Sequence, residues 1–201
     1  MADTSTAPDS ILEAGTTAPD FTLKATPDQS LSLSELKGNP VVLVFYPADW
    51  SQVCGDELAV FNQSLPLLQE YGAVLLGISV DSAWSHQAFK ESRKLGYDLL
   101  ADYNPKGAVS KEYGAYDEQA GCSKRALFVV DADGVISWSY LSPMAINPGV
   151  NGVLDALEAL DRELAQLGVE LHLAAVPEAA LCAAPAEPRS APSCPMRPRR
   201  S

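Results

Sequence analysis

One cysteine of this 201-residue chain stands where a strand should give way to a helix. It is Cys54, and it follows a continuous apolar run over residues 41–46 that is typical of a strand buried on both faces. Ser51 stands where the helix should begin, so its hydroxyl can serve as an N-cap, and Pro47 fixes the turn and shields one side of the thiol from water. The unpaired N–H groups and positive dipole end of a helix favour a thiolate in its first turn. The pattern therefore predicts a nucleophile rather than an inert, buried cysteine.

The remaining cysteines and the two histidines add no second kind of site. Cys122, Cys182 and Cys194 stand far apart, no CxxC pair occurs, and neither His86 nor His172 is close to any of them. This spacing excludes a zinc site, and we expect neither a metal nor a cofactor. A disulfide scaffold is not expected in a reducing compartment, which leaves individual thiols that are catalytic or inert.

The elements that must position Cys54 alternate between strands and helices. Apolar residues at helical spacing predict helices over 51–71, 82–95, 105–113 and 153–167. Continuous or alternating apolar runs predict strands at 19–23, 31–33, 41–46, 73–80, 98–100, 126–130, 135–140 and 169–173. The first two strands form an N-terminal hairpin. This order predicts an α/β fold in which a central mixed β-sheet is flanked by helices.

Composition divides the chain into three parts. Residues 1–17 are small and polar and predict a flexible N-terminal segment, residues 18–173 hold one domain, and the Pro-, Ala- and Arg-rich residues 174–201 predict a disordered tail. The net charge of −12 argues against nucleic acid and anionic membranes as partners. No run approaches the roughly 18 apolar residues of a membrane span, and no secretory signal is recognisable, so we expect a cytoplasmic protein.

Three segments, in order, resemble those of a known family. Pro47-x-x-x-Ser51-x-x-Cys54 resembles the peroxiredoxin signature Pro-x-x-x-Thr-x-x-Cys, with Ser in place of Thr. Residues 77–82 resemble the family's second core strand, and residues 125–131 resemble the segment that carries its active-site arginine. The similarity follows the alkyl hydroperoxide reductase/thiol-specific antioxidant family. It implies a thioredoxin-like fold and a thiol-dependent peroxidase that reduces hydrogen peroxide and organic hydroperoxides in antioxidant defence and redox homeostasis.

The resemblance also implies a role for each residue that matches the motif. Cys54 would attack a peroxide oxygen as a thiolate and become a sulfenic acid. The Ser51 hydroxyl would bond to the thiolate and the substrate, and Arg125 would stabilise the thiolate and the charge on the leaving oxygen. Glu57 either anchors Arg125 or is an exposed acid in the first turn of its helix.

The step that regenerates Cys54 stays open at this point. Many peroxiredoxins carry a resolving cysteine five residues after the peroxidatic one, and Ala59 excludes that subtype here. Cys122, Cys182 and Cys194 are the candidate resolving residues. An external thiol, such as thioredoxin or a low-molecular-weight thiol, needs none of them and is slightly favoured. The resemblance also suggests a homodimer or a larger homo-oligomer.

Two other functions compete with the peroxidase. A thioredoxin-like thiol–disulfide oxidoreductase is the stronger rival, because residues 50–54 superficially mimic Trp-Cys-x-x-Cys. That chemistry uses the first cysteine as its nucleophile, and here the residue is Ser51. A redox-inactive binding module that keeps the fold is the second rival. Trp50 could line the access to the site, whereas Trp84 and His86 are interpreted as packing and solvated helix face rather than ligands.

Overall fold

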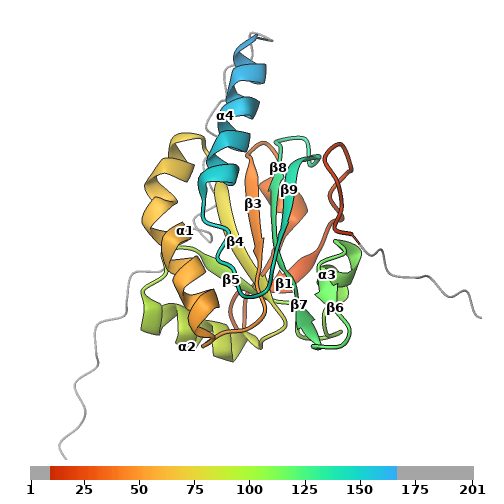
Figure 1. The fold of residues 1–201 in the computed structure, drawn as a ribbon, viewed down its shortest axis with the longest axis vertical. Coiled ribbons are helices and arrows are strands. Elements are labelled where there is room, and N and C mark those ends of the chain that lie inside the picture. The colour runs from red at the N-terminus through yellow and green to blue at the C-terminus, as the bar shows by residue number, and fades with distance from the viewer. Residues whose placement is uncertain (1–9, 167–201) are drawn as a thin grey trace, which may run out of the picture.

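The strand that precedes Cys54 lies near the middle of a seven-stranded mixed sheet in the computed structural model, which describes residues 10–166 (Figure 1). The strand order is β2-β1-β5-β4-β3-β8-β9. Strands β3, β4 and β5 are parallel, and the other neighbouring pairs are antiparallel. The strands are β1 (Thr22–Lys24), β2 (Ser30–Ser32), β3 (Val41–Phe45), β4 (Val74–Ser79), β5 (Asp98–Ala101), β8 (Arg125–Val130) and β9 (Ile136–Ser142).

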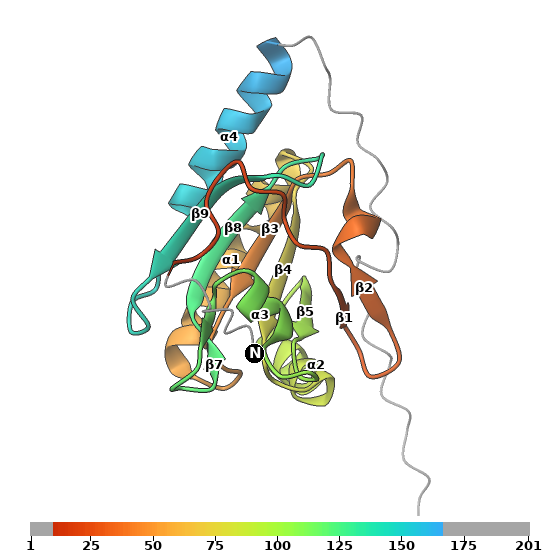
Figure 2. The same cartoon turned by 90° about the vertical axis from the view of Figure 1, so that its right-hand side faces the viewer.

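Helices cover both faces of this sheet. Helices α1 (Gln52–Glu70), α2 (Ala83–Arg93) and α4 (Asn151–Gln166) pack on one face. The other face is covered by α3 (Ala108–Glu112), the 3-10 helix η1 (Leu33–Leu36) and the chain before β1 (Figure 2). A separate two-stranded sheet joins β6 (Tyr116–Asp117) and β7 (Cys122–Ser123) just before β8. These layers confirm the predicted α/β fold with a central mixed sheet.

The residues of β3 alternate between two hydrophobic cores. Val41, Leu43 and Phe45 face the side of α3, and Val42 and Val44 face the side of α1. All five residues are buried, as the continuous apolar run predicts. The N-terminal hairpin is also confirmed, since β1 and β2 pair antiparallel. The strand that leads to Cys54 is therefore held from both faces.

The predicted flexible segment, residues 1–17, is wrong for residues 10–17. Ile11 is buried in the core, and the backbone N–H of Leu12 donates to the carbonyl of Tyr113 at 3.1 Å. Gly114 makes room for this segment, because a Cβ there would lie 2.4 Å from the carbonyl oxygen of Ser10. A single apolar pair has no periodicity, which is why the sequence pattern does not indicate the contact. Residues 1–9 lie outside the described part.

Three further elements differ from the sequence prediction. The helix expected over 105–113 is reduced to α3, and the two-residue strands β6 and β7 are too short for any pattern to indicate. The predicted strand at 169–173, the tail 174–201, Cys182 and Cys194 lie outside the described residues. Among the helices of residues 10–166, none has the length and apolarity needed to cross a membrane.

Candidate active site

Cys54 lies in the first turn of α1, as predicted, and has no solvent-exposed area. The chain leaves β3 at Phe45, turns through half-buried Pro47, and enters the helix after Ser51. Ser51 occupies the N-cap position with extended backbone, and its carbonyl accepts from the N–H of Gly55 at 2.8 Å. Its hydroxyl makes no capping bond, so the predicted side-chain cap is wrong. The thiol of Cys54 nevertheless sits at the helix end where backbone N–H groups are unpaired.

Arg125 reaches the Cys54 thiol from the neighbouring strand. It is the first residue of β8, and the next residue, Ala126, pairs with Phe45 at the end of β3. The Arg125 Nη2 donates to Cys54 Sγ at 3.5 Å, although only 1% of the arginine is exposed. Its Nε and Nη2 also donate to the carbonyl of Met144 at 3.2 and 3.0 Å. A rigid guanidinium fork thus reaches both the thiol and a loop carbonyl.

Glu57 completes the group as the ion partner of Arg125. It follows Cys54 by three residues on α1, so the two side chains share one face of the helix. Its Oε2 accepts from Arg125 Nη1, and the carboxylate is fully buried. Of the two roles that the sequence left open, the anchor of Arg125 is therefore the correct one. Its second oxygen, Oε1, is buried with no hydrogen-bond partner among the described residues.

This arrangement suits chemistry that places negative charge on sulfur or on an atom bound to it. A guanidinium in a water-poor site interacts strongly with an anion because the local dielectric constant is low. Glu57 and the Met144 carbonyl fix the Arg125 guanidinium before any reaction, so little reorganisation is needed when negative charge develops beside it. No three His, Cys, Asp or Glu side chains of residues 10–166 gather as metal ligands do.

Cys122 is placed differently from Cys54. It lies in β7 and is half-buried, three residues before Arg125. Burial, and after it the charge of Asp117, raise the pKa of the Cys122 thiol above its ordinary value. Lys124, next to Arg125, directs its ammonium to the carbonyl of Gly114 at 3.3 Å. The cation that contacts the Cys54 thiol is thus Arg125.

The sequence did not predict a polar cluster that joins the active-site loop to α2. His86 is 1% exposed, so its assignment to packing or a solvated helix face misses a buried polar role. Its ring contacts Asp49, which follows Pro47 by two residues and is also buried. Trp84 is 72% exposed and does lie on the solvated face. The only sequence signal was an Asp in the loop and a His on the next helix, and this pair is too common to be specific.

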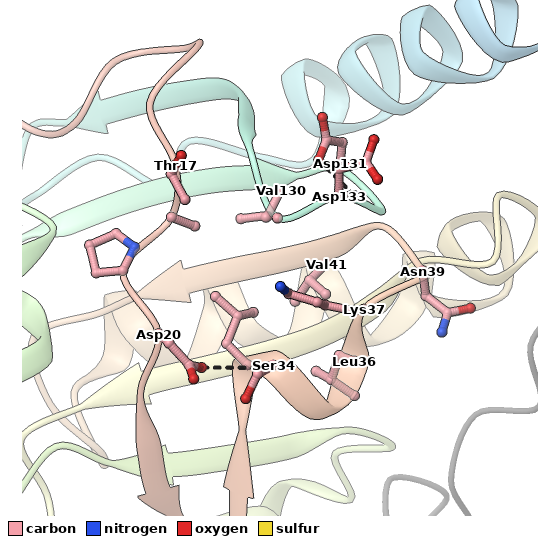
Figure 3. A pocket seen from close by; sticks show the side chains of 14 residues that line it. Thr17, Asp20, Ser34, Leu36, Lys37, Asn39, Val41, Val130, Asp131 and Asp133 are labelled. Carbon is pink, nitrogen blue, oxygen red and sulfur yellow. Dashed lines mark hydrogen bonds between the residues drawn. The ribbon is translucent and has the colours of Figure 1, made fainter.

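A cavity lies at the ends of β3 and β8 that point away from Cys54. It measures about 390 Å³ and is lined by Val41 and Val130, the first residue of β3 and the last of β8 (Figure 3). Cys54 and Arg125 belong to the opposite ends of these strands. Inside the cavity Asp20 accepts from the N–H of Ser34 at 2.9 Å. The cavity is separate from the thiol site, and its size does not identify the active site.

Comparison with known proteins decides the family. The sequence model of the AhpC/TSA family matches residues 14–139, which include every residue of the group around Cys54 except Met144. The chain belongs to the AhpC/TSA family. This peroxiredoxin is 36% identical over 147 residues to the chloroplastic peroxiredoxin Q of Oryza sativa subsp. japonica, with 73% of the chain and 67% of that protein covered. It is 37% identical over 130 residues to alkyl hydroperoxide reductase E of Mycobacterium tuberculosis, with 64% and 85% covered.

Solved structures agree with this assignment. The crystal structure of Enterococcus faecalis AhpC aligns with a TM-score of 0.70 and 28% identity over 80% of this peroxiredoxin and 98% of that chain. Peroxidoxin BcpB from Mycobacterium tuberculosis aligns with a TM-score of 0.67 and 29% identity over 74% and 98%. The fold of the peroxiredoxin is thioredoxin-like, and its activity is that of a thiol-dependent peroxidase. This activity excludes the two rival functions, a thioredoxin-like thiol–disulfide oxidoreductase and a redox-inactive binding module.

Proposed function

We propose that this peroxiredoxin reduces hydrogen peroxide and organic hydroperoxides at Cys54 and is recycled by an external thiol. The observation that carries the proposal is the contact between Arg125 Nη2 and Cys54 Sγ at 3.5 Å. A cation fixed beside a thiol favours the thiolate, which is the reactive form. Glu57 keeps the guanidinium in place, and we expect Pro47 to shield one side of the thiol from water.

The first step forms one bond and breaks one bond. The Cys54 thiolate attacks one peroxide oxygen, the O–O bond breaks, and the alkoxide or hydroxide leaves and takes a proton. Sulfur is oxidised to the sulfenic acid while the peroxide is reduced to an alcohol or water. Arg125 stabilises the charge on the leaving oxygen. The Ser51 hydroxyl makes no hydrogen bond that caps the helix, so it is available to bond to the thiolate and the substrate.

Recycling then requires two thiols. The first displaces water from the sulfenic acid and forms a mixed disulfide, and the second releases Cys54 as a thiol. The raised pKa of Cys122 leaves little thiolate at neutral pH, which makes Cys122 a poor attacking group. We therefore favour an external donor, either thioredoxin or a low-molecular-weight thiol, over an internal Cys54–Cys122 disulfide. Cys182 and Cys194 compete as internal partners.

The test combines cysteine variants with mass spectrometry. Wild-type protein is expected to consume hydrogen peroxide with a thiol donor, and Cys54→Ser is expected to lose this activity while keeping its fold. Single substitutions Cys122→Ser, Cys182→Ser and Cys194→Ser should leave turnover within about twofold, since an external thiol needs none of them. After one equivalent of peroxide without donor, non-reducing mass spectrometry should find sulfenic acid at Cys54. A crosslink from Cys54 to another cysteine would refute the external donor but not the peroxidase.

We further propose that a second copy of the chain pairs with this one. Strand β9 is an edge strand, and such an edge offers unpaired backbone groups. Exposed apolar side chains continue from this strand into the loop after it: Tyr140, Leu141, Met144 and Ile146. Light scattering should give at least twice the chain mass, and Leu141→Lys should lower it. A mass of one chain for the wild type at micromolar concentration would contradict this proposal.

A further inference from the structure

The loop between β3 and Cys54 is tied to α2 by a buried polar cluster that the peroxidase chemistry does not use. Asp49, in this loop, accepts hydrogen bonds from Tyr46 Oη at 2.8 Å and from Ser85 Oγ at 2.7 Å. His86 Nδ1 lies 3.0 and 3.2 Å from its two carboxylate oxygens. Asp49 and His86 are 6% and 1% exposed. A carboxylate this deeply buried needs its partners, because an unpaired buried charge is strongly unfavourable.

The partners of His86 decide how many protons its ring carries. Nε2 lies 3.1 Å from the carbonyl oxygen of Leu100, which can only accept, so this nitrogen carries a proton. Nδ1 faces the Asp49 carboxylate, and the Tyr46 hydroxyl also donates its hydrogen bond to Asp49. Burial alone would raise the pKa of Asp49, but hydrogen bonds and charge from His86 and bonds from Ser85 and Tyr46 lower it. Acceptors therefore face both ring nitrogens of His86, which is the arrangement of an imidazolium paired with the Asp49 carboxylate.

The residue after Asp49 has an unusual backbone. Trp50 has a φ of 63°, in the left-handed region that bulky side chains rarely adopt. Such a conformation persists only where the surrounding structure holds it. Trp50 leads directly into Ser51, the N-cap of α1, and thus sets the direction in which the helix carrying Cys54 begins.

Contacts with the loop after β4 and with α2 hold both residues of this turn. The backbone N–H of Asp49 donates to Asp81 Oδ2 at 2.8 Å. The indole Nε1 of Trp50 donates to Ser85 Oγ at 3.3 Å, and its ring packs edge-on against Phe89 with centroids 5.1 Å apart. The left-handed turn is thus held on one side by Asp49 and its cluster and on the other by the Trp50 ring.

We propose that His86 is a positioning residue for the peroxidase: through Asp49 its imidazolium holds Trp50 in the left-handed turn that sets Cys54 opposite Arg125. The groups that face His86 are Asp49 and Tyr46 from the loop and the Leu100 carbonyl from β5. Without the cation, Asp49 loses its main partner and the turn relaxes toward ordinary backbone angles. Cys54 then lies less accurately against the guanidinium. The inference rests on the proposed role of Cys54.

The decisive experiment is a double-substitution cycle between His86 and Trp50. The rate is read as loss of the free Cys54 thiol after mixing with hydrogen peroxide, well below the unfolding temperature of each variant. His86→Gln should slow it roughly tenfold to a hundredfold, because a small misplacement of a reacting group has effects of this size. Glycine adopts the left-handed region freely, so in the Trp50→Gly background His86→Gln should slow it by less than about threefold. Equal losses in both backgrounds, or no loss in either, would overturn the proposal.

A matched pair of tyrosines covers the case in which His86→Gln does not fold. Tyr46 and Tyr113 are both buried, and each hydroxyl donates one bond of 2.8 Å, to Asp49 and to the carbonyl of Pro19 respectively. Tyr46→Phe and Tyr113→Phe should lose comparable stability, but Tyr46→Phe alone should slow Cys54 oxidation. Equal rates for the two variants would mean that the cluster only stabilises the fold.

Two readouts separate this inference from the function on which it rests. Nitrogen NMR of the reduced wild type at pH 7 should find both ring nitrogens of His86 protonated, and an unprotonated Nδ1 would overturn the proposed cation whatever the activity. Peroxide consumption by Cys54→Ser would instead refute the role of Cys54, and it would leave the protonation state of His86 as found.

Discussion

Arg125 Nη2 lies 3.5 Å from Cys54 Sγ, and both side chains are buried. Removing this donor should slow oxidation of Cys54 by hydrogen peroxide by about a hundredfold to a thousandfold, the usual effect of losing one preorganised donor to a developing anion. Arg125→Gln is the variant, and rapid-mixing measurement of Cys54 oxidation is the readout. Lys124→Gln is the matched control, because that ammonium bonds to Gly114 instead. Similar rates for the two variants would contradict the role of Arg125.

Arg125→Lys tests whether a charge alone is enough. Arginine bonds simultaneously to Glu57, Met144 and Cys54, whereas an ammonium on a flexible stem cannot reproduce this planar fork. We expect Arg125→Lys to remain at least about tenfold slower than the wild type, since the geometry of the donor matters as well as its charge. Full activity in the lysine variant would mean that only the positive potential counts.

The Glu57–Arg125 pair should also be important for stability. Glu57→Gln leaves the guanidinium as a buried cation without its counter-ion, and breaking a buried pair in this way costs about 3–5 kcal/mol. Urea denaturation at neutral pH measures the loss. Glu158→Gln is the matched control, because Glu158 and Arg162 form an exposed pair at 3.8 Å, and exposed pairs contribute about 0–1 kcal/mol. Equal losses would show that the buried pair is not structural.

Substitutions of Ser51 distinguish a catalytic role of its hydroxyl from a role in capping α1. Its hydroxyl makes no bond to the helix, so Ser51→Ala should leave the free energy of unfolding nearly unchanged while it slows peroxide reduction. Ser51→Thr keeps the hydroxyl and restricts its rotation, so it should retain activity. Ser82→Ala gives the contrast in stability, because Ser82 caps α2 by accepting from the N–H of Ser85, and such caps contribute about 0.5–2 kcal/mol. Equal peroxide rates for Ser51→Ala and wild type would refute the proposed hydroxyl role.

The sequence was informative wherever burial produces a long pattern. Val41–Phe45 is buried on both faces, and the apolar run alone indicated this. Cys54 could be placed because it follows such a strand and precedes a helical repeat, whereas Arg125 was identified through the resemblance of residues 125–131 to the segment that carries the family's active-site arginine. The contact between these two residues depends on the antiparallel pairing of β8 with β3, which a sequence pattern does not specify.

The polar cluster could not be predicted, for a related reason. Helix α2 carries few apolar residues, and Trp84 is a better core candidate by residue type than His86. The structure buries His86 and Phe89, three residues apart, and exposes Trp84. A histidine becomes a core residue here only because Asp49 and the Leu100 carbonyl satisfy both ring nitrogens. Its burial thus depends on partners 37 and 14 residues away along the chain.

The lowered pKa of Asp49 makes a part of the stability dependent on pH. A carboxyl group whose pKa in the folded state lies below its ordinary value of 3.8 contributes stability that is complete above that value. The contribution is lost as the pH falls through the folded-state pKa, because the proton then binds and the bonds from His86, Ser85 and Tyr46 weaken.

Asp49→Asn removes this contribution, so the variant should be less stable than the wild type at pH 7. The difference should shrink as the pH falls below about 4. Denaturation midpoints at pH 7, 5, 4 and 3 measure it, and a difference that stays constant over this range would mean that the Asp49 carboxylate does not contribute through its charge.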